Sequence, residues 1–297
     1  MKYLRILSIL IFIVISYASY VVVWGLHFPE DSPNIVYKRN GGSSAFRLNE
    51  LQKRKDIDVL ITGSSHACRG IDSRYLEQKG IKTFNMGSSS QTPIQTKWLL
   101  KRHLDKLNPK LVILEVDPSI FRSDAIESSL DMVSNYPKVV STLPLAWGHL
   151  KTFNTYIFSL YHAIFKSNEA LKINWRDTYH IGGYVERKLS YYQVEEFQKE
   201  RWDFNYDLFS ELEETIDILK SKDINYVLVQ APLSPAFYFS HSNNQEFDDK
   251  INKLGTYYNY NDLMKWDNKT HFYDKQHLNT IGARRLTAAI LQLKELP

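Results

Sequence analysis

The sequence predicts an α/β fold, in which a mostly parallel sheet carries a helical insertion and follows one N-terminal transmembrane helix. Short apolar runs typical of buried strands alternate with amphipathic runs of helical period along residues 56–297. This alternation is typical of parallel α/β sheets. Near the N-terminus, residues 6–26 contain no Asp, Glu, Lys or Arg. As a helix, that stretch spans about 31 Å, enough to cross a bilayer.

The charges around the apolar stretch predict its orientation. Lys2 and Arg5 precede it, and Glu30 and Asp31 follow it. The positive-inside rule then places the N-terminus in the cytoplasm and the rest of the chain outside, in the periplasm or at the cell surface. The alternative is a cleaved signal peptide. The stretch is longer than a usual signal-peptide core, and residues 16–20 make a poor cleavage site, so we favour an uncleaved single-pass anchor over residues 1–28.

Residues 29–55 are predicted to form a stalk and entry segment, and residues 56–297 the main domain. Within this domain, Asp72 is a predicted helix N-cap. The strand candidates are residues 58–62, 81–85, 111–116 and 225–230, and the helix candidates are residues 93–107, 206–222 and 279–296.

Residues 118–203 are too long for a simple crossover between parallel strands, so they are predicted to be an insertion. Residues 145–171 within it fit one long helix or two short ones. The insertion is rich in Tyr, Phe and Trp. These aromatics could line a sugar-binding groove or rest against the membrane interface, but we favour the core of a helical subdomain for most of them.

The composition excludes several classes of protein. Lys and Arg number 37 against 33 Asp and Glu, and a net charge of +4 is too small to argue for a nucleic-acid partner. With 43% hydrophobic and 24% charged residues, the chain has the composition of a folded globular protein. The single cysteine, Cys68, excludes an intramolecular disulfide and a cysteine-based zinc cluster, and it is expected to be a small buried residue.

Ligands of an open parallel sheet bind beyond the carboxyl ends of its strands. The first predicted strand ends in Gly63-Ser64-Ser65, a loop that can expose a hydroxyl and direct backbone N–H groups at one point. By itself the tripeptide is equally consistent with a tight turn or a helix cap.

A second polar group lies near the C-terminus, where Asp274 and His277 precede the last predicted helix. A carboxylate three residues from an imidazole can orient it toward a serine hydroxyl, which activates that hydroxyl as a nucleophile. Taken alone, the pair also fits two ordinary surface residues. His271 adds a potential metal ligand, but Asp274 and His277 suit Ser65 better, so we expect neither a metal ion nor a cofactor.

Together, a serine after the first strand and an Asp-x-x-His block before the last helix resemble the SGNH, or GDSL-like, hydrolase family. The resemblance implies a three-layer α/β/α, flavodoxin-like fold. It also implies that Ser65 is the nucleophile, His277 the general base and Asp274 the orienting acid. In the second block of the family, a glycine N–H helps to bind the oxyanion. Gly87 resembles that glycine, and Asn85 is a further candidate.

Two positions depart from the family pattern. Ser64 replaces the aspartate of the first block, as in membrane-anchored envelope relatives such as D-alanine-transfer and alginate O-acetylation proteins. Asp117 stands near the place where the third block has an asparagine. An ionised Asp cannot donate a hydrogen bond to an oxyanion. His66 and Arg69, just after Ser65, are expected either to contact substrate anions or to be solvated.

These observations predict a membrane-anchored, extracytoplasmic serine esterase or O-acyltransferase. The resemblance implies acyl esters, chiefly acetyl esters, of cell-envelope glycans as substrates, and an envelope polysaccharide or an acyl-donating membrane protein as partner. The sequence leaves hydrolysis and transfer both open. The alternative is a catalytically silent SGNH-like protein that binds glycan or acts as a scaffold in an envelope-modification complex.

Overall fold

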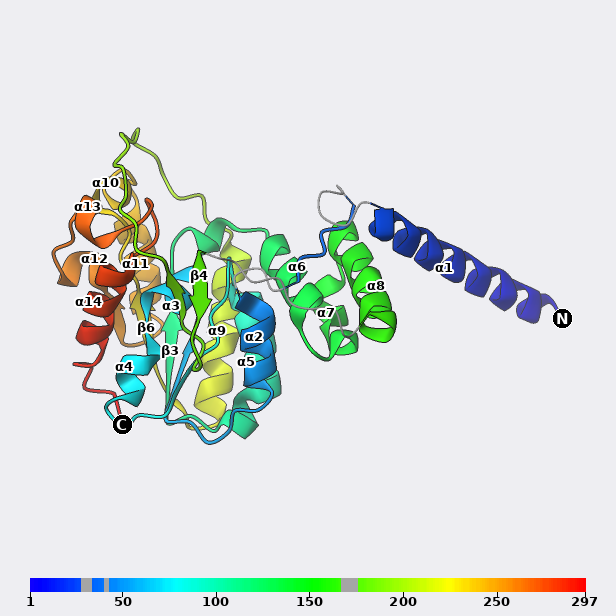
Figure 1. The fold of residues 1–297 in the computed structure, drawn as a ribbon, viewed down its shortest axis with the longest axis horizontal. Helices are drawn as coiled ribbons and strands as arrows, with labels where there is room; N and C mark the ends of the chain where they lie inside the picture. The colour runs from blue at the N-terminus through cyan, green and yellow to red at the C-terminus, as the bar shows by residue number, and fades with distance from the viewer. Residues whose placement is uncertain (28–33, 40–42, 167–175) are drawn as a thin grey trace. The chain divides into compact units, whose positions relative to one another are not determined.

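The computed structural model describes residues 1–27, 34–39, 43–166 and 176–297, which form two compact units (Figure 1). The first unit comprises Met1–Ala45 and Ser129–Lys172, and the second comprises Phe46–Ser128 and Ile173–Pro297. Glu30, Asp31 and Trp175, residues 40–42 of the predicted stalk and the end of the predicted helix at 145–171 lie outside the described residues.

The second unit is built on a five-stranded sheet in the order β2-β1-β3-β6-β7. All of its pairings are parallel. Numbered along this sheet alone, the strands run 2-1-3-4-5, the flavodoxin-like order, and the predicted α/β class is confirmed. Its strands are β1 (Val59–Thr62), β2 (Thr83–Asn85), β3 (Leu111–Glu115), β6 (Asn225–Gln230) and β7 (Tyr257–Asn259).

The three central strands β1, β3 and β6 are almost entirely apolar because both faces of the sheet are covered. Val59, Ile61 and Ile113 belong to a core shared with α3 (Ser65–Gly70) and α14 (Thr280–Ile290). Leu60 and Val112 alternate to the opposite face and are fully buried. There α9 (Tyr206–Ser221) packs against α5 (Pro93–Leu107), and Figure 1 shows the two side by side. The three predicted layers are therefore present.

The predicted elements agree closely with this unit, with two differences. The bounds of α5 and β6 are those predicted, and the Asp72 side chain caps α4 (Ser73–Glu77) by accepting from the Arg74 N–H. The last helix, α14, is shorter than predicted. The fifth strand, β7, was not predicted because its sequence, Tyr-Tyr-Asn, lacks an apolar run. The remaining helices of the described chain, apart from those of the insertion and α1, are α2 (Ser44–Leu51), α10 (Pro235–Tyr238), α11 (Asn244–Asn252), α12 (Tyr260–Leu263) and α13 (Asn268–His271).

The insertion is only partly helical. It begins with the 3-10 helix η2 (Ile120–Arg122), α6 (Ile126–Asn135) and the 3-10 helix η3 (Val139–Thr142). Two helices then follow, α7 (Leu143–Ala146) and α8 (Leu150–Phe165). An unpredicted antiparallel hairpin of β4 (Asp177–Tyr179) and β5 (Val185–Arg187) belongs to the second unit. The aromatic side chains of the insertion differ in exposure to solvent: Tyr156, Phe158, Tyr184 and Tyr192 are buried, whereas Trp147, Phe165 and Tyr191 are exposed.

The first unit holds α1 (Lys2–His27), the one helix of the described chain that is long and apolar enough to cross a membrane, a property that signal sequences share. Its C-terminal turns pack against α8. Val21 forms a small core with Ile35, Tyr37 and Phe158. Gly25 lies so close to Phe158 that a Cβ atom there would be 2.5 Å from the ring.

Candidate active site

The loop after β1 presents Ser65 as the first residue of α3. Gly63 has a φ of +142°, and a Cβ atom on it would lie 2.6 Å from Glu115 Oε2, so only glycine fits this turn. Ser64 caps α3 by accepting from the His66 N–H at 3.1 Å. The Ser64 N–H and Oγ both donate to Glu115 Oε2, at 2.8 and 2.9 Å. Glu115, the last residue of β3, therefore holds in place the turn that carries Ser65.

Ser65, His277 and Asp274 form a continuous hydrogen-bonded line. The Ser65 Oγ lies 2.8 Å from His277 Nε2. The Nδ1 atom of the same ring lies 2.9 Å from Asp274 Oδ2 and 3.0 Å from Oδ1. These distances join a hydroxyl, a base and an orienting carboxylate in the order that serine nucleophiles require.

The turn before α14 holds the acid and the base in a fixed relation. The N–H groups of Gln276 and His277 donate to Asp274 Oδ1 at 2.8 and 2.7 Å, and the Tyr273 N–H donates to the His277 carbonyl at 3.1 Å. Partial burial by itself would raise the pKa of Asp274. The hydrogen bonds from His277 and from the two backbone N–H groups outweigh burial and lower that pKa to about 2. Asp274 is thus a carboxylate at neutral pH.

The His277 ring is also held on its faces. Tyr273 stacks parallel to it, with ring centroids 5.4 Å apart and an interplanar angle of 5°. His66 lies at 4.9 Å, tilted by 35°. The Arg187 guanidinium in turn lies 4.6 Å from the centre of the Tyr273 ring. The same guanidinium donates a hydrogen bond to Asp177. His277 therefore has a fixed orientation toward Ser65.

Gly87 and Asn85 lie beside this loop, but their hydrogen bonds are already used. The Gly87 N–H donates to Asn85 Oδ1 at 3.1 Å. The Asn85 amide nitrogen donates to the carbonyls of Ala67 and Ile71, at 2.8 and 3.0 Å. Together they tie the end of β2 to α3. Within the described residues, the Ser65 N–H has no protein acceptor, so it is an open backbone donor next to the Ser65 hydroxyl.

Asp117, which stands where an asparagine was expected, makes its own local bonds. Its Oδ1 accepts from the N–H of Ser119 at 2.8 Å and also from the Ser119 hydroxyl. Its Oδ2 lies 3.8 Å from His66 Nδ1. His66 is buried, and so is Arg69, which pairs with Asp177 at 2.9 Å. The expectation that His66 and Arg69 are solvated is therefore wrong.

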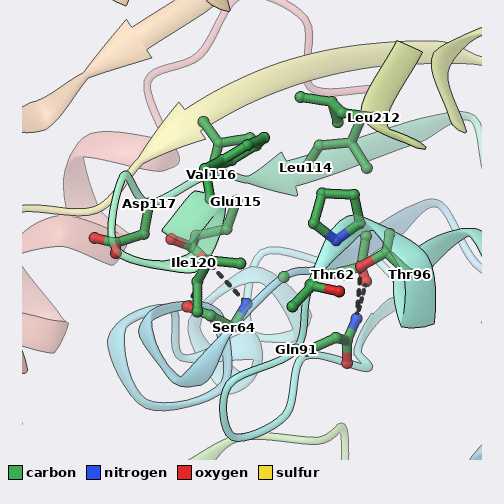
Figure 2. Close-up of a pocket in the computed structure, with 14 residues that line it drawn as sticks. Thr62, Ser64, Gln91, Thr96, Leu114, Glu115, Val116, Asp117, Ile120 and Leu212 are labelled. Carbon is green, nitrogen blue, oxygen red and sulfur yellow. Dashed lines mark hydrogen bonds between the residues drawn. The ribbon is translucent and has the colours of Figure 1, made fainter. Parts of the chain in front are cut away.

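Glu115 was missed by the sequence analysis, although it ends the clearest predicted strand. Burial raises its pKa to about 7, against the lowering effect of His66 and of the Ser64 hydrogen bonds. Figure 2 shows Glu115 beside Ser64, in a cavity that also contains Asp117 and Gln91. Among the described residues, Glu115 Oε1 has no hydrogen-bond partner.

Two hollows lie beyond the carboxyl ends of the strands, and one of them borders Ser65 and His277. A small one of about 180 Å³ is bounded by Ser65, His277 and the apolar Ala231, Pro232 and Leu278, among others. A larger groove of about 850 Å³ lies beyond the ends of β6 and β7. The aromatic side chains of the groove are Tyr238, Phe239 and Trp266, and its polar ones are Asn261, Asp262 and Lys265.

The two hollows share a loop. Ala231 and Pro232 bound the small one, and Leu233 and Pro235 the groove. The Ser234 N–H donates to the carbonyl of Lys275 at 3.1 Å, inside the turn that carries the acid and the base. Residues 231–235 therefore border both hollows and contact the turn that carries Asp274 and His277.

His271 turns away from Asp274. Its Nδ1 accepts from the Asp267 N–H at 3.0 Å, and its Nε2 lies 3.3 Å from an Arg285 nitrogen. The part of the chain that the structure describes contains no cluster of three His, Cys, Asp or Glu side chains able to hold a metal ion.

No model of a known protein family matches the chain, and no curated protein does. Among solved structures, the chain is similar to a GDSL-like lipase from Bacteroides thetaiotaomicron, at 13% identity and a TM-score of 0.44, over 84% of this chain and 96% of the other. It is also similar to a protein from Bacteroides fragilis provisionally named an acylhydrolase, at 14% identity and a TM-score of 0.44, over 85% and 94%. Function follows from neither likeness at this level of similarity, and the case for the site rests on its own geometry.

Proposed function

We propose that the chain is a membrane-anchored serine esterase or O-acyltransferase of the SGNH type that acts on short acyl esters of cell-envelope glycans. One observation carries this proposal: Ser65 Oγ is 2.8 Å from His277 Nε2, and the other nitrogen of that ring is 2.9 Å from Asp274. This arrangement makes a hydroxyl nucleophilic at neutral pH.

In the first half-reaction, Ser65 Oγ attacks the ester carbonyl carbon and gives its proton to His277 Nε2. The carbonyl π electrons move to oxygen. When the tetrahedral intermediate collapses, the bond to the alcohol breaks, and His277 returns the proton to the leaving oxygen. Asp274 keeps the ring in the tautomer that accepts at Nε2 and stabilises the imidazolium. The acyl group is then held as an ester of Ser65.

We assign the oxyanion to the Ser65 N–H, for which the described residues offer no acceptor. The Gly87 N–H joins it once it exchanges its 3.1 Å bond to Asn85 for one to substrate. Such bonds often tighten only in the complex. Asn85 itself does not donate to the oxyanion, because both of its amide hydrogens are committed to the carbonyls of Ala67 and Ile71.

The hollows support the choice of substrate. The hollow at Ser65 is lined by His66, Arg69 and His277 as well as by Ala231, Pro232 and Leu278, and its small size favours a short acyl chain such as acetyl over a long one. The larger groove combines aromatic rings with an amide, a carboxylate and an ammonium group. Such a lining suits a polar, ring-containing alcohol, that is, a sugar, better than a lipid tail.

The proposed cellular setting follows from α1. The helix has the length and the apolar composition of a membrane span, and Lys2 and Arg5 at its start favour a cytoplasmic N-terminus with the catalytic unit outside. In that setting the acceptor or donor is an envelope polysaccharide or an acyl-donating membrane protein.

Hydrolysis and transfer differ only in the second half-reaction, where either water or a sugar hydroxyl attacks the acyl-enzyme. The test uses the full chain in detergent micelles with p-nitrophenyl acetate, with and without an oligosaccharide acceptor. Release of nitrophenol should disappear in Ser65→Ala and persist in Ser89→Ala, a serine of the loop after β2. Mass spectrometry of the sugar then separates transfer, which acetylates it, from hydrolysis. Equal rates in wild type and Ser65→Ala would overturn the proposal.

A catalytically silent glycan-binding or scaffold protein is the second candidate. The observation that favours it is the engagement of Gly87 and Asn85 with each other and with α3, which leaves the oxyanion fewer donors. That candidate predicts no turnover of any ester, together with oligosaccharide binding that Ser65→Ala leaves unchanged.

A further inference from the structure

The polarity of α8 is inverted relative to that of a helix in a water-soluble protein. Its inward face is largely polar, and its open face is apolar. The buried polar side chains are Thr152, Asn154, Thr155, Ser159 and His162. Along the opposite face, Leu150 and Ile164 are exposed and Phe153, Ile157, Leu160 and Tyr161 are half-buried. Of these, Ile157, Leu160 and Tyr161 also pack with one edge against small cores of the first unit. At 100° per residue, these six fall within one continuous face of the helix, which we call the α8 stripe.

The inward polar groups have partners within the first unit. Asn154 Oδ1 accepts from the Tyr17 hydroxyl at 2.6 Å. Thr155 Oγ1 accepts from the Val36 N–H at 3.0 Å. The Ser159 hydroxyl donates to the Thr155 carbonyl at 2.7 Å. With mostly polar side chains inside and apolar ones outside, α8 has the pattern of a helix that faces lipid.

The contact with α1 puts α8 at membrane depth. About 20 helical residues cross the hydrocarbon core, so a span that starts after Arg5 ends near Gly25. Tyr17 then lies roughly 12 Å inside the outer boundary at 1.5 Å per residue. Because Tyr17 and Gly25 touch Asn154 and Phe158 of α8, at least this part of α8 lies level with the outer half of the span.

The charges around α8 fit a lipid surface. Between Asp131 and Glu169 the sequence contains no acidic residue, but it contains Lys138 and Lys151. Lysines flanking an apolar face attract anionic headgroups. Trp147, just before α8, is 74% exposed, and tryptophan favours the membrane interface.

We propose that α8 lies in the outer leaflet beside α1, with the α8 stripe against lipid acyl chains and Lys138 and Lys151 among anionic headgroups. The proposal rests on the membrane anchor of the proposed function. It goes beyond that anchor because a second element, far along the chain, enters the bilayer. The aromatics of the α8 stripe then serve lipid contact and not a sugar-binding groove.

The test measures the depth of single positions in the full chain, reconstituted in vesicles of phosphatidylcholine and phosphatidylglycerol. An NBD fluorophore is attached to Ile164→Cys in the stripe, to Ile9→Cys in α1 and to Leu263→Cys, an exposed apolar control in α12. Native Cys68 is 2% exposed and stays in place, with the unsubstituted chain as the labelling blank. Lipids carrying a doxyl quencher at acyl carbon 5 or 12 report contact and depth.

We expect doxyl lipids to quench Ile164→Cys and Ile9→Cys strongly and Leu263→Cys little, with the carbon-5 quencher more effective at position 164. If position 9 is quenched but position 164 behaves like position 263, the anchor stands and this inference is overturned. If position 164 is shielded from water yet unquenched by lipid, a protein contact covers the stripe, which also overturns it. If position 9 itself is not quenched, the anchor fails and the inference fails with it.

To detect misfolding caused by the label, each variant is compared with wild type by thermal unfolding. Tyr161→Cys, a second stripe position, repeats the measurement if Ile164→Cys is unstable. Failure of the anchor or of the stripe leaves the Ser65 chemistry untouched, because ester hydrolysis is measured separately in micelles.

Discussion

Glu115 supports the position of Ser65 through Ser64. Its Oε2 accepts both the backbone N–H and the hydroxyl of Ser64, which lies 51 positions earlier in the chain. Ser64 in turn caps α3, whose first residue is Ser65. The orientation of Ser65 therefore depends on a buried acid at the end of the neighbouring strand.

The first prediction concerns the pH dependence of stability. The pKa of Glu115 is raised from 4.5 to about 7 in the folded protein, so the folded state binds the proton more tightly than the unfolded state. Stability from this group is fully present below pH 4.5 and is lost as the pH rises through 7, by on the order of 3 kcal/mol. Glu115→Gln should remove this dependence, which urea unfolding of both proteins from pH 5 to pH 8 measures. The same slope in both proteins would contradict it.

The second prediction concerns Asp274. Asp274→Asn should lower kcat on p-nitrophenyl acetate by up to about 10⁴-fold, because the amide favours the wrong tautomer of His277. Because its folded-state pKa is about 2, Asp274 contributes stability above its ordinary pKa of 3.8 that is lost as the pH falls through 2. Asp223→Asn, a surface change after α9, is the matched control and should keep kcat. A wild-type rate in Asp274→Asn would exclude its orienting role.

The third prediction concerns Gly87. A Cβ atom there would lie 2.8 Å from the Ala67 Cβ and 3.1 Å from the carbonyl oxygens of Gly63 and Ser64. Gly87→Ala should therefore push the nucleophile loop, destabilise the protein by about 1–3 kcal/mol and lower kcat. Adding Ala67→Gly should recover part of the kcat loss.

The control for Gly87→Ala is Gly70→Ala, whose nearest neighbour is a Leu286 methyl at an ordinary 3.6 Å. Thermal unfolding of the two single variants compares them directly. Equal stability of Gly87→Ala and Gly70→Ala would show that the loop has room for a side chain at position 87.

The fourth prediction is that α1 remains in the mature protein. Val21 and Gly25 of α1 pack against Phe158, and removal of α1 would expose this large apolar ring to water. Intact mass spectrometry of the protein from the membrane fraction should give the full 34.8 kDa. A mass that corresponds to a chain starting after residue 20 would identify a cleaved signal peptide.

Much of the sheet could be predicted because its central strands are buried on both faces and appear in the sequence as apolar runs. Strand β7 could not be predicted in this way. It has only three residues, Tyr257–Asn259, lies at the edge of the sheet and contains no apolar run. The helix pattern of α5 was strong because Thr92 and Gln95 form a capping box at its start. The C-terminal end of α14, at Ile290, was predicted too far along the chain because no Gly or Pro follows it directly to mark the end of the helix.

The candidate site could be predicted only in part. Ser65, Asp274 and His277 came from motif order and family resemblance, and the hydrogen-bonded line among them agrees with that assignment. The pairing of Glu115 with Ser64 depends on the register of β1 against β3, which pairs Thr62 with Leu114 and which no local pattern reveals. The burial of His66 and Arg69 likewise depends on distant residues, Asp117 and Asp177.

The most direct test of the central claim is covalent labelling of the full chain with a fluorophosphonate, followed by mass spectrometry to locate the adduct. An activated serine is required for this reaction. We expect one adduct, on Ser65, which Ser65→Ala abolishes and His277→Ala greatly slows. No adduct on the wild type, or equal labelling of Ser65→Ala, would contradict a Ser65 nucleophile.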